Sequence, residues 1–337
     1  MTRPVCITGA TGFVGSHVVD AFLAAGIPVR AAVRSPDDEE KTRHLVAMAE
    51  RHGGDLTFHE ANLREPGSFD EAVAGCDGVI HVAAVARLTA PNPQAQIVDP
   101  SIEGARTVLA AATKAGVRRV VLTSSIAAIG SYRASQEHPL TEADWNDVAT
   151  LESDPYGFAK TSAERLAWTQ SEDAPWDLVV LNPVLVFGPV FNKRHARASP
   201  STLRDVLRNA FPALPKMCFG LVDVRDVATA HLEAYRRPEA AGRHLLHAGN
   251  RWLREIGAEL RTVYPERNIR TRQLPNFLVR LSARFDDRVD TKVLDDTLDR
   301  APRYDGNHAP NALGFRYRDL SETLQDTAQS MIDQSFV

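Results

Sequence analysis

Short β-rich runs and longer amphipathic segments alternate between residues 4 and 123, and this alternation constrains the fold more than any other feature. Strands are expected at 4–8, 29–33, 56–59, 78–82 and 119–123. Helices are expected between them at 13–25, 37–52, 68–74 and 100–115. Strands that alternate with helices over short connections predict a parallel sheet, wound right-handedly and covered by helices on both faces.

The alternation becomes less regular after residue 123. A helix is expected at 155–170 and a sixth strand at 178–181, followed by a stretch rich in Pro and Arg at 189–215. We therefore expect an α/β chain in which a doubly wound sheet domain carries a smaller C-terminal substrate-binding lobe. The sheet domain is predicted to comprise 1–182 and a returning segment near 217–248, and the lobe to comprise 183–216 and 249–337.

Charge and cysteine usage exclude several classes of protein. Among 337 residues, 39 Lys and Arg stand against 43 Asp and Glu, a net charge of −4, which argues against a nucleic-acid partner. No stretch approaches the ~18 apolar residues of a membrane span. Cys6, Cys76 and Cys218 are far apart, and His244 and His247 have no third ligand nearby, so no metal site is expected. Such cysteines predict reduced thiols in a cytoplasmic protein.

A glycine-rich turn lies directly between the first strand and the first helix. Residues 8–15 read Thr-Gly-Ala-Thr-Gly-Phe-Val-Gly. Gly9 permits a tight turn, Gly12 lets the backbone approach a diphosphate, and Gly15 lets the helix pack closely against the strand. The exposed N–H groups and the positive end of the helix dipole then receive the anion. In this strand–turn–helix context the pattern predicts a dinucleotide site of the Rossmann type.

The end of the second strand discriminates between two dinucleotides. An acidic residue there binds the ribose 2′-hydroxyl of NAD, whereas an arginine accommodates the 2′-phosphate of NADP. This chain has Arg34 at that place and Lys41 beyond it, while Asp37 and Asp38 come too late to be the ribose acid. NADP(H) is therefore the predicted cofactor, with NAD(H) less favoured. The alternative is that Arg34 only solvates a loop.

Two further strand ends carry residues that fit beside a cofactor. Asn62 and Leu63 follow the third strand and could flank the adenine. Val82, Ala83 and Ala84 follow the fourth strand, where small side chains let a backbone pass a cofactor closely. The same residues are also typical of any tight strand end.

A phenol and an ammonium group are predicted on one face of the helix at 155–170. Tyr156 and Lys160 are four residues apart, which is about one helical turn. A phenol in water titrates near pH ~10, and a neighbouring cation favours its ionised form, so such a pair is suited to proton exchange near neutral pH. Ser124 and Ser125 end the fifth strand, at the sheet edge where ligands bind, and a hydroxyl there can hold a carbonyl oxygen.

These motifs, in this order, resemble the extended short-chain dehydrogenases/reductases of the NAD-dependent epimerase/dehydratase superfamily. More narrowly, the chain is similar to the branch of dihydroflavonol reductases and cinnamoyl-CoA reductases, with aldehyde and ketone reductases from bacteria and yeast. The likeness covers nearly the whole chain. The segments that carry it are 8–15, 32–34, 121–125, 156–160, 182–189, 222–228 and 313–315.

The resemblance implies a role for each candidate residue. Tyr156 would donate a proton to the substrate carbonyl, Lys160 would hold the nicotinamide ribose, and Ser125 would bond to the substrate oxygen. Ser125 is preferred to Ser124 because adjacent strand residues point to opposite faces. The nicotinamide carboxamide would lie along 183–186. The cofactor-binding residues would be Gly9, Thr11, Gly12, Phe13, Val14, Gly15, Arg34, Lys41, Asn62, Leu63, Val82, Ala83, Ala84, Tyr156, Lys160, Pro183, Val184 and Val186.

Three positions depart from the family pattern. Ser101 stands where many relatives have a proton-relaying asparagine, Asn62 where relatives have an acid, and Gly130 where plant flavonoid reductases have a polar substrate contact. The glycine argues against a flavonoid substrate. A set of apolar and aromatic residues, some of them expected in the core, instead predicts an apolar or aromatic carbonyl. The set comprises Leu88, Ile126, Ile129, Tyr132, Trp145, Phe187, Phe191, Phe211 and Phe219.

These inferences favour an NADPH-dependent reductase of a ketone or aldehyde, an enzyme of class EC 1.1.1.-. Two alternatives stay open. One is oxidation of an alcohol in the manner of a 3-beta-hydroxysteroid dehydrogenase, which an apolar pocket suits equally. The other is a sensor that binds NADP without turnover, although the intact pair Tyr156 and Lys160 argues against it. A homodimer is expected by analogy with the fold alone.

Overall fold

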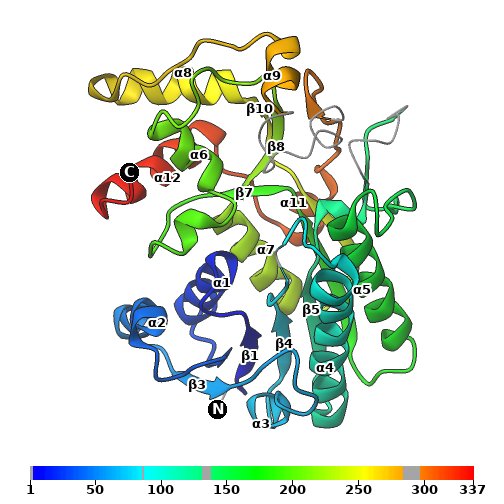
Figure 1. Cartoon of the computed structure of the whole chain (residues 1–337). Coiled ribbons are helices and arrows are strands. Elements are labelled where there is room, and N and C mark those ends of the chain that lie inside the picture. The colour runs from blue at the N-terminus through cyan, green and yellow to red at the C-terminus, as the bar shows by residue number, and fades with distance from the viewer. Residues whose placement is uncertain (1–2, 86, 131–137, 284–296) are drawn as a thin grey trace.

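The computed structural model describes residues 3–85, 87–130, 138–283 and 297–337. Its main feature is a parallel sheet of seven strands in the order β3-β2-β1-β4-β5-β6-β9. These strands are β1 (Val5–Thr8), β2 (Val29–Val33), β3 (Leu56–Glu60), β4 (Gly78–His81), β5 (Arg119–Thr123), β6 (Asp177–Pro183) and β9 (Gly242–Leu246). Figure 1 shows β1, β4 and β5 of this sheet beside one another. The doubly wound α/β fold predicted from the sequence is confirmed.

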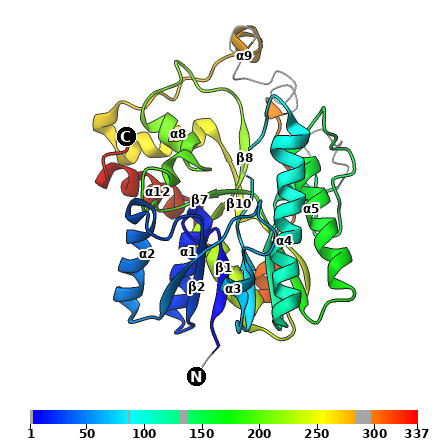
Figure 2. The same cartoon turned by 60° about the horizontal axis from the view of Figure 1, so that its bottom comes forward.

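Each face of this sheet is covered by its own layer of helices (Figure 2). Successive residues of β1 show the division, because Val5 and Ile7 pack into one core while Cys6 packs into the other. The first layer comprises α1 (Phe13–Ala24), α2 (Glu39–His52) and α7 (Val224–Arg236). The second comprises α3 (Asp70–Val73), α4 (Asp99–Ala115) and α5 (Pro155–Ser171). Burial on both faces explains why the strands read as continuous apolar runs.

The predicted elements of the sheet domain agree with the structure to within about two residues. Helix α2 begins at Glu39 rather than at residue 37, because Asp38 is its N-cap and accepts the Lys41 N–H at 3.3 Å. Strand β6 continues to Pro183 instead of ending at residue 181, since residues 179–183 pair with β9. The partner strand β9 lies in the returning segment near 217–248, which the sequence analysis assigned to the sheet domain.

A second lobe is built around a three-stranded sheet in the order β10-β8-β7. The strands are β7 (Leu185–Phe187), β8 (Cys218–Asp223) and β10 (Gly249–Trp252). Its helices are α6 (Ser201–Leu207), α8 (Leu253–Val263), α9 (Asn276–Ala283), α11 (His308–Leu313) and α12 (Leu320–Asp333). The returning segment is divided, because α7 and β9 join the large sheet while β8 pairs in the small one. The lobe boundaries drawn from the sequence stay a prediction.

The cysteines agree with the expectation from their spacing, since Cys6, Cys76 and Cys218 are free and buried. Along the described ranges, no helix combines the length and apolar character needed to cross a membrane. The same ranges contain no group of three or more His, Cys, Asp or Glu side chains placed to hold a metal ion.

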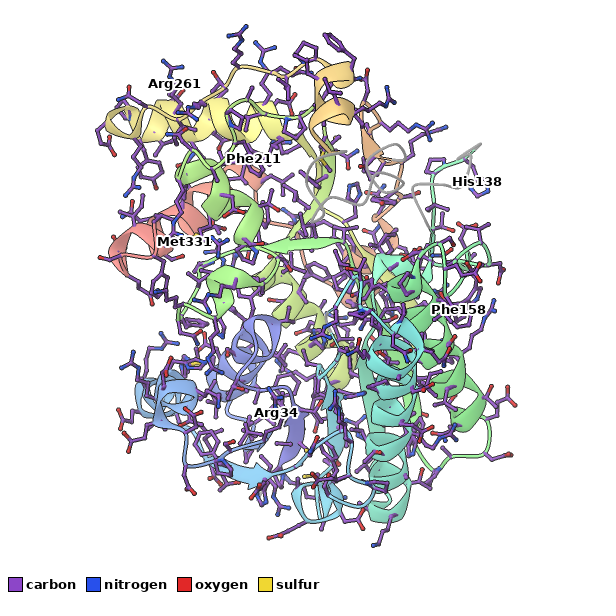
Figure 3. All side chains as sticks on the ribbon, in the orientation of Figure 1. Arg34, His138, Phe158, Phe211, Arg261 and Met331 are labelled. Atoms are coloured by element: carbon purple, nitrogen blue, oxygen red, sulfur yellow. The ribbon has the colours of Figure 1, made fainter. Side chains whose placement is uncertain are left out.

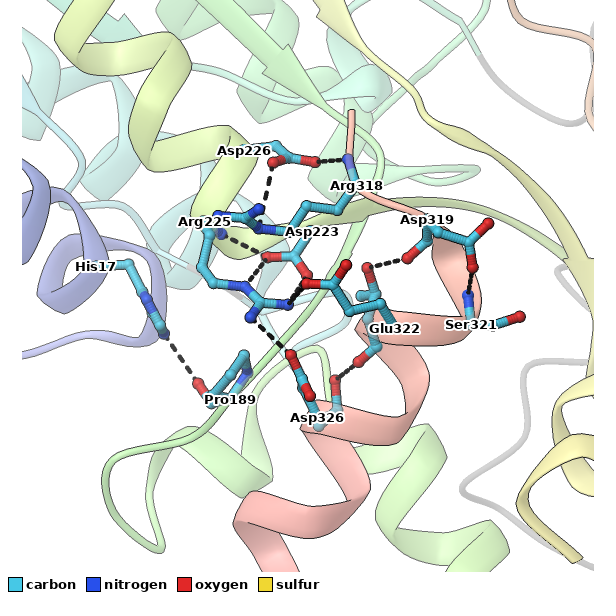
Figure 4. A network of polar contacts seen from close by, with 12 residues as sticks. His17, Pro189, Asp223, Arg225, Asp226, Arg318, Asp319, Ser321, Glu322 and Asp326 are labelled. Atoms are coloured by element: carbon cyan, nitrogen blue, oxygen red, sulfur yellow. Dashed lines mark hydrogen bonds and ion pairs between the residues drawn. The ribbon is translucent and has the colours of Figure 1, made fainter. Parts of the chain in front are cut away.

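A polar network joins β8 and α7 to the C-terminal helix α12 (Figure 4). Arg225 bonds to Asp223 through Nε–Oδ1 at 2.9 Å and Nη2–Oδ2 at 2.7 Å. Its Nη1 also reaches Asp326 Oδ2, on α12, at 2.6 Å. Asp226 accepts the backbone N–H of Arg318 at 2.7 Å, just before α12 begins. Since Asp223 and Asp226 are almost completely buried, these bonds fix the last helix of the lobe to the sheet domain.

The first prediction concerns Asp226. Burial raises the pKa of its carboxyl to about 6, although the Arg318 N–H works in the other direction. The folded state therefore prefers the protonated carboxyl, and the stability that it contributes is lost as the pH rises from about 4 through about 6. Asp226→Asn has no charge to bury, so we expect its unfolding free energy, relative to that of the wild type, to rise by about 1–2 kcal/mol between about pH 4 and pH 6. Urea unfolding at a series of pH values measures this, and a constant difference between the two proteins contradicts it.

Candidate active site

The turn between β1 and α1 is shaped by backbone contacts that leave no room for side chains. Gly9 has a φ of +67°, and a Cβ there would lie 2.8 Å from backbone atoms of Ala83. A Cβ on Gly15, inside α1, would lie 2.1 Å from the Gly9 carbonyl oxygen. Gly12 is the N-cap of α1, and its N–H donates to the same oxygen at 2.9 Å. Gly9 and Gly15 thus stand where a tight turn and close helix packing require glycine.

Side chains bond to two carbonyl groups of this turn. Ser16 Oγ donates to the Ala10 oxygen at 3.0 Å and accepts from His44 Nε2, on α2, at 2.8 Å. His195 Nε2 donates to the Thr11 oxygen at 3.1 Å. Burial lowers the pKa of His44 and of His195 to about 4, so both rings are neutral near pH 7. No side chain of the described residues caps the start of α1, which suits the diphosphate of a dinucleotide.

The cations at the end of β2 differ in how far they are engaged. Arg34 is exposed (Figure 3) and forms no hydrogen bond or ion pair with any residue that the structure describes. Lys41 is instead paired with Asp38. Hydrogen bonding to Lys41 holds the pKa of the Asp38 carboxyl below its usual value, and the charge of Arg194 adds to this effect. The charge of Arg34 is therefore available to an anion, whereas the charge of Lys41 is already paired with that of Asp38.

Thr8 joins the carboxyl ends of β1 and β4. Its hydroxyl accepts the N–H groups of Val82 at 3.1 Å and Ala83 at 3.0 Å, and donates to His81 Nδ1 at 2.8 Å. Burial, together with the charge of Lys160, lowers the pKa of His81 to about 3, so the ring is neutral and its Nδ1 can accept. The segment that follows β4 is thereby held beside the glycine turn.

A pocket with about 400 Å³ of empty space, counted with the solvent at its mouth, lies between β4, β5, α4 and α5. It brings the predicted cofactor residues Leu63, Ala83, Ala84 and Lys160 together with His81, Ser101, Ser124 and Glu164. Ser124 Oγ is buried without a hydrogen-bond partner among the described residues, which fits a site that receives a polar group. Asn62 uses its side chain locally, because its Nδ2 donates to Glu65 at 2.6 Å.

Helix α5 carries the predicted proton donor in its first turn. Asp154 is the N-cap and accepts the Gly157 N–H at 2.9 Å, and Pro155 opens the helix. This start places Tyr156 and Lys160 one turn apart, both half-buried. The phenol and the ammonium group therefore belong to the same end of one helix.

The two serines after β5 have different surroundings. Ser124 lines the pocket, while Ser125 Oγ accepts the Ala127 N–H at 3.2 Å and caps the 3₁₀ turn Ile126–Ala128. Asn146 Nδ2 donates to the Ala127 oxygen at 2.8 Å, and a Cβ on Gly157 would lie 2.9 Å from the same nitrogen. Asn146 thus packs between the serine turn and the start of α5. The sequence analysis missed it, as it missed His195, because neither residue lies near its partners in the chain.

The segment predicted to lie along the nicotinamide is at the carboxyl edge of the sheet. Pro183 ends β6, and the Val184 N–H donates to the Leu246 oxygen of β9 at 3.2 Å. The side chains of Val184 and Val186 are buried in the main core. Any contact of these residues with a cofactor would therefore come through the backbone.

The predicted apolar residues are distributed between core and surface. Ile129 and Phe187 are completely buried and belong to the core, whereas Leu88 is 70% exposed. Trp145 is covered by the Arg243 guanidinium, 3.9 Å from the ring centre. The partly buried members are Ile126, Phe191, Phe211 and Phe219. Figure 3 shows Phe211 in the second lobe, near α8. Tyr132 lies outside the described residues.

The space beside Gly130 is filled by an aliphatic side chain. A Cβ on Gly130 would lie 2.4 Å from Leu140 Cδ1. Leu140 is itself held by the C-terminal lobe, since its N–H donates to the Arg303 oxygen at 2.9 Å. The space beside Gly130 is therefore apolar in this chain, while the substrate class stays a prediction.

Known proteins resemble this chain over most of its length. Residues 5–247 match the NAD dependent epimerase/dehydratase family. The chain is 33% identical to the cinnamoyl-CoA reductase CAD2 of Medicago truncatula over 344 residues, 98% of this chain and 96% of the relative. It is 34% identical to the bifunctional dihydroflavonol 4-reductase/flavanone 4-reductase of Pyrus communis, over 80% of this chain and 79% of the relative. The structure of the yeast methylglyoxal/isovaleraldehyde reductase Gre2 complexed with NADPH has a TM-score of 0.80 at 25% identity, covering 99% of this chain and 100% of that one.

The second prediction concerns Gly15. Replacing a glycine inside a helix by alanine normally stabilises the protein by up to ~1 kcal/mol. At Gly15 we expect the opposite sign, a loss of about 1–3 kcal/mol, because the new Cβ would collide with the Gly9 oxygen. Urea unfolding measures the loss, and cofactor titration is expected to show weaker binding. Gly104→Ala in α4 is the control, since its nearest neighbours are side-chain atoms of Leu63 at 3.2 Å or more. Unchanged or higher stability of Gly15→Ala contradicts the prediction.

Proposed function

We propose that this chain, which belongs to the NAD dependent epimerase/dehydratase family as its motifs predicted, is a reductase that uses NADPH to convert an apolar or aromatic ketone or aldehyde into the alcohol. Its relatives are oxidoreductases that act on carbonyl or alcohol groups, and this chain is an oxidoreductase of the same kind. The observation that supports the finer proposal is that Tyr156 and Lys160 lie one turn apart on α5, and that Lys160 lines one pocket together with Ser124 and Ala83.

The residues of the chain have complementary tasks in this reaction. Ser125 holds the carbonyl oxygen by a hydrogen bond, and Tyr156 donates its phenolic proton to that oxygen. Lys160, one turn further along α5, contributes a positive charge that favours the phenolate left behind. When bound, the cofactor supplies the hydride for the carbonyl carbon. One hydride and one proton give the alcohol, and the phenolate then regains a proton from solvent.

Several features support NADP(H) as the cofactor. The uncapped start of α1 and the glycine turn would hold the diphosphate, and Arg34, with Lys41, would hold the 2′-phosphate. The yeast relative of similar structure was solved with NADPH. Leu63, Ala83 and Ala84 would flank the cofactor within the pocket. NAD(H) is less favoured, because Arg34 follows β2 where an acid would be needed, and Asp38 already caps α2 and pairs with Lys41.

Three other functions use the same fold. Oxidation of an alcohol, in the manner of a 3-beta-hydroxysteroid dehydrogenase, needs the same groups in reverse. A dinucleotide sensor needs binding without turnover, and the presence of Tyr156 and Lys160 argues against it. Loss of water from a sugar nucleotide needs acids beside the serine, where this chain has Ile126 and Ala127. A cytoplasmic location and a homodimer stay predictions.

The third prediction is that Tyr156→Phe removes the proton donor and little else. We expect turnover to fall about 100- to 10,000-fold, while the Kd for NADPH stays within about twofold of the wild type. Cofactor oxidation is followed with a panel of aromatic and aliphatic aldehydes and ketones, with NADPH and NADH side by side. Tyr235→Phe, which removes a hydroxyl bonded to Asp77 outside the site, is the matched control and should keep its turnover. Near-full activity of Tyr156→Phe contradicts the assigned role.

The fourth prediction concerns Arg34 and the choice of cofactor. We expect Arg34→Ala to weaken NADPH binding about 10- to 100-fold, because the 2′-phosphate loses a charged hydrogen-bonding partner. Binding of NADH, which has no 2′-phosphate, is expected to stay unchanged. Fluorescence titration of both reduced cofactors measures the effect. Arg261→Ala, on α8 in the other lobe (Figure 3), is the control. Equal weakening for both cofactors would show that Arg34 does not recognise the 2′-phosphate.

A further inference from the structure

Helix α5 carries one partner of a buried ion pair on the same face as Tyr156 and Lys160. Glu164 follows Lys160 by one helical turn and Tyr156 by two, so the three side chains share one face. Glu164 Oε1 accepts from Arg243 Nε, on β9, at 2.6 Å. The Glu164 side chain is 0% exposed and the Arg243 side chain 7%. Glu164 also lines the pocket that contains Lys160.

The other oxygen of Glu164 leads to the serine end of β5. Asn182 Nδ2, at the end of β6, donates to Glu164 Oε2 at 2.9 Å. The same nitrogen donates to the Ser125 carbonyl oxygen at 3.1 Å. Because Asn182 is completely buried, these bonds are shielded from bulk solvent. One side-chain amide therefore connects the helix that carries Tyr156 with the backbone of the candidate serine.

Arg243 completes the connection from the opposite side. Its Nη1 donates to the carbonyl oxygens of Glu142 at 2.7 Å and Asp144 at 2.5 Å. Its Nη2 donates to the carbonyl oxygen of Ala128, the last residue of the turn that Ser125 caps, at 3.3 Å. The guanidinium also stacks on Trp145 at 3.9 Å. The arginine thus bonds in fixed directions to two loops and to α5 at once.

We propose that Glu164, Asn182 and Arg243 are positioning residues that hold the hydroxyl of Ser125 and the phenol of Tyr156 in the relative arrangement that the reaction needs. The inference rests on the proposed function. A buried ion pair is not needed for stability alone, since apolar residues of similar volume often stabilise a core as well or better. The directed bonds of the pair do what apolar packing does not, because they admit a single geometry of the turn, the strand end and the helix.

The test replaces the ion pair by apolar side chains in the variant E164M/R243M. We expect its Tm to stay within a few degrees of the wild-type value, because no unpaired charge remains buried. We expect kcat to fall about 100-fold while KM for the carbonyl and Kd for NADPH change by less than about threefold, since the groups are displaced but not removed. A variant that keeps both its Tm and its kcat overturns the proposal.

A matched control comes from the ion pair between Asp223 and Arg225. Asp223, 1% exposed, pairs with Arg225 away from the pocket. Asp223→Asn is expected to lower Tm and to leave the kcat of the folded enzyme unchanged. If this control loses kcat as E164M/R243M does, the loss reports general destabilisation and the positioning role is refuted.

Two further measurements keep the test decisive. If E164M/R243M does not fold, Asn182→Ala leaves the ion pair in place and removes only the bridge to Ser125; an unchanged kcat then overturns the proposal. A crystal structure of either variant gives a readout that needs no turnover. The distance between Ser125 Oγ and Tyr156 Oη is expected to change by about 1 Å, and an unchanged distance contradicts the inference. A wild type without turnover on the carbonyl panel would instead refute the proposed function, while the crystallographic distance still judges the positioning role.

Discussion

The contact between the glycine turn and the backbone that follows β4 is the constraint on which the candidate site depends. No side chain fits at Gly9, because Ala83 is too close, or at Gly15, because the Gly9 carbonyl is too close. Thr8 strengthens the contact by bonding to the first two N–H groups after β4. With these backbones locked together, the start of α1 faces the carboxyl edge of the sheet, where a topological switch between β1 and β4 opens a crevice for a ligand.

Buried charges then decide how the surrounding elements are held. Arg225 with Asp223 joins α12 to α7, and Arg243 with Glu164 joins β9 and two loops to α5. In both cases an arginine fork bonds to groups that come from distant parts of the chain. Removing charges from water is costly unless every partner is well placed, so such pairs are weak evidence for added stability, and the role proposed for Glu164 and Arg243 is to fix geometry. The proposed chemistry depends on such geometry, because a hydroxyl, a phenol and a nicotinamide must converge on one carbonyl group.

The sheet domain was predictable because its signals are local. Strands β2 and β5 have the predicted bounds, since burial on both faces makes each a short, mostly apolar run. The second lobe was harder to predict. Strands β7 and β10 have only three and four residues, and they are defined by pairing with β8 rather than by any periodicity. Similarly, β9 joins the large sheet only because β6 offers it a free edge.

The sequence by itself determined the glycine turn, the phenol and ammonium group one turn apart, and the arginine after β2, because each follows from steric limits or spacing within a few residues. Only the tertiary structure decided that His195 bonds to the turn 184 residues away, that Asn146 packs between the serine turn and α5, and that Glu164 meets Arg243 across 79 residues. Such contacts form where separate elements pack together, and hydrogen-bonding directions and burial, which no local pattern encodes, then select the partners.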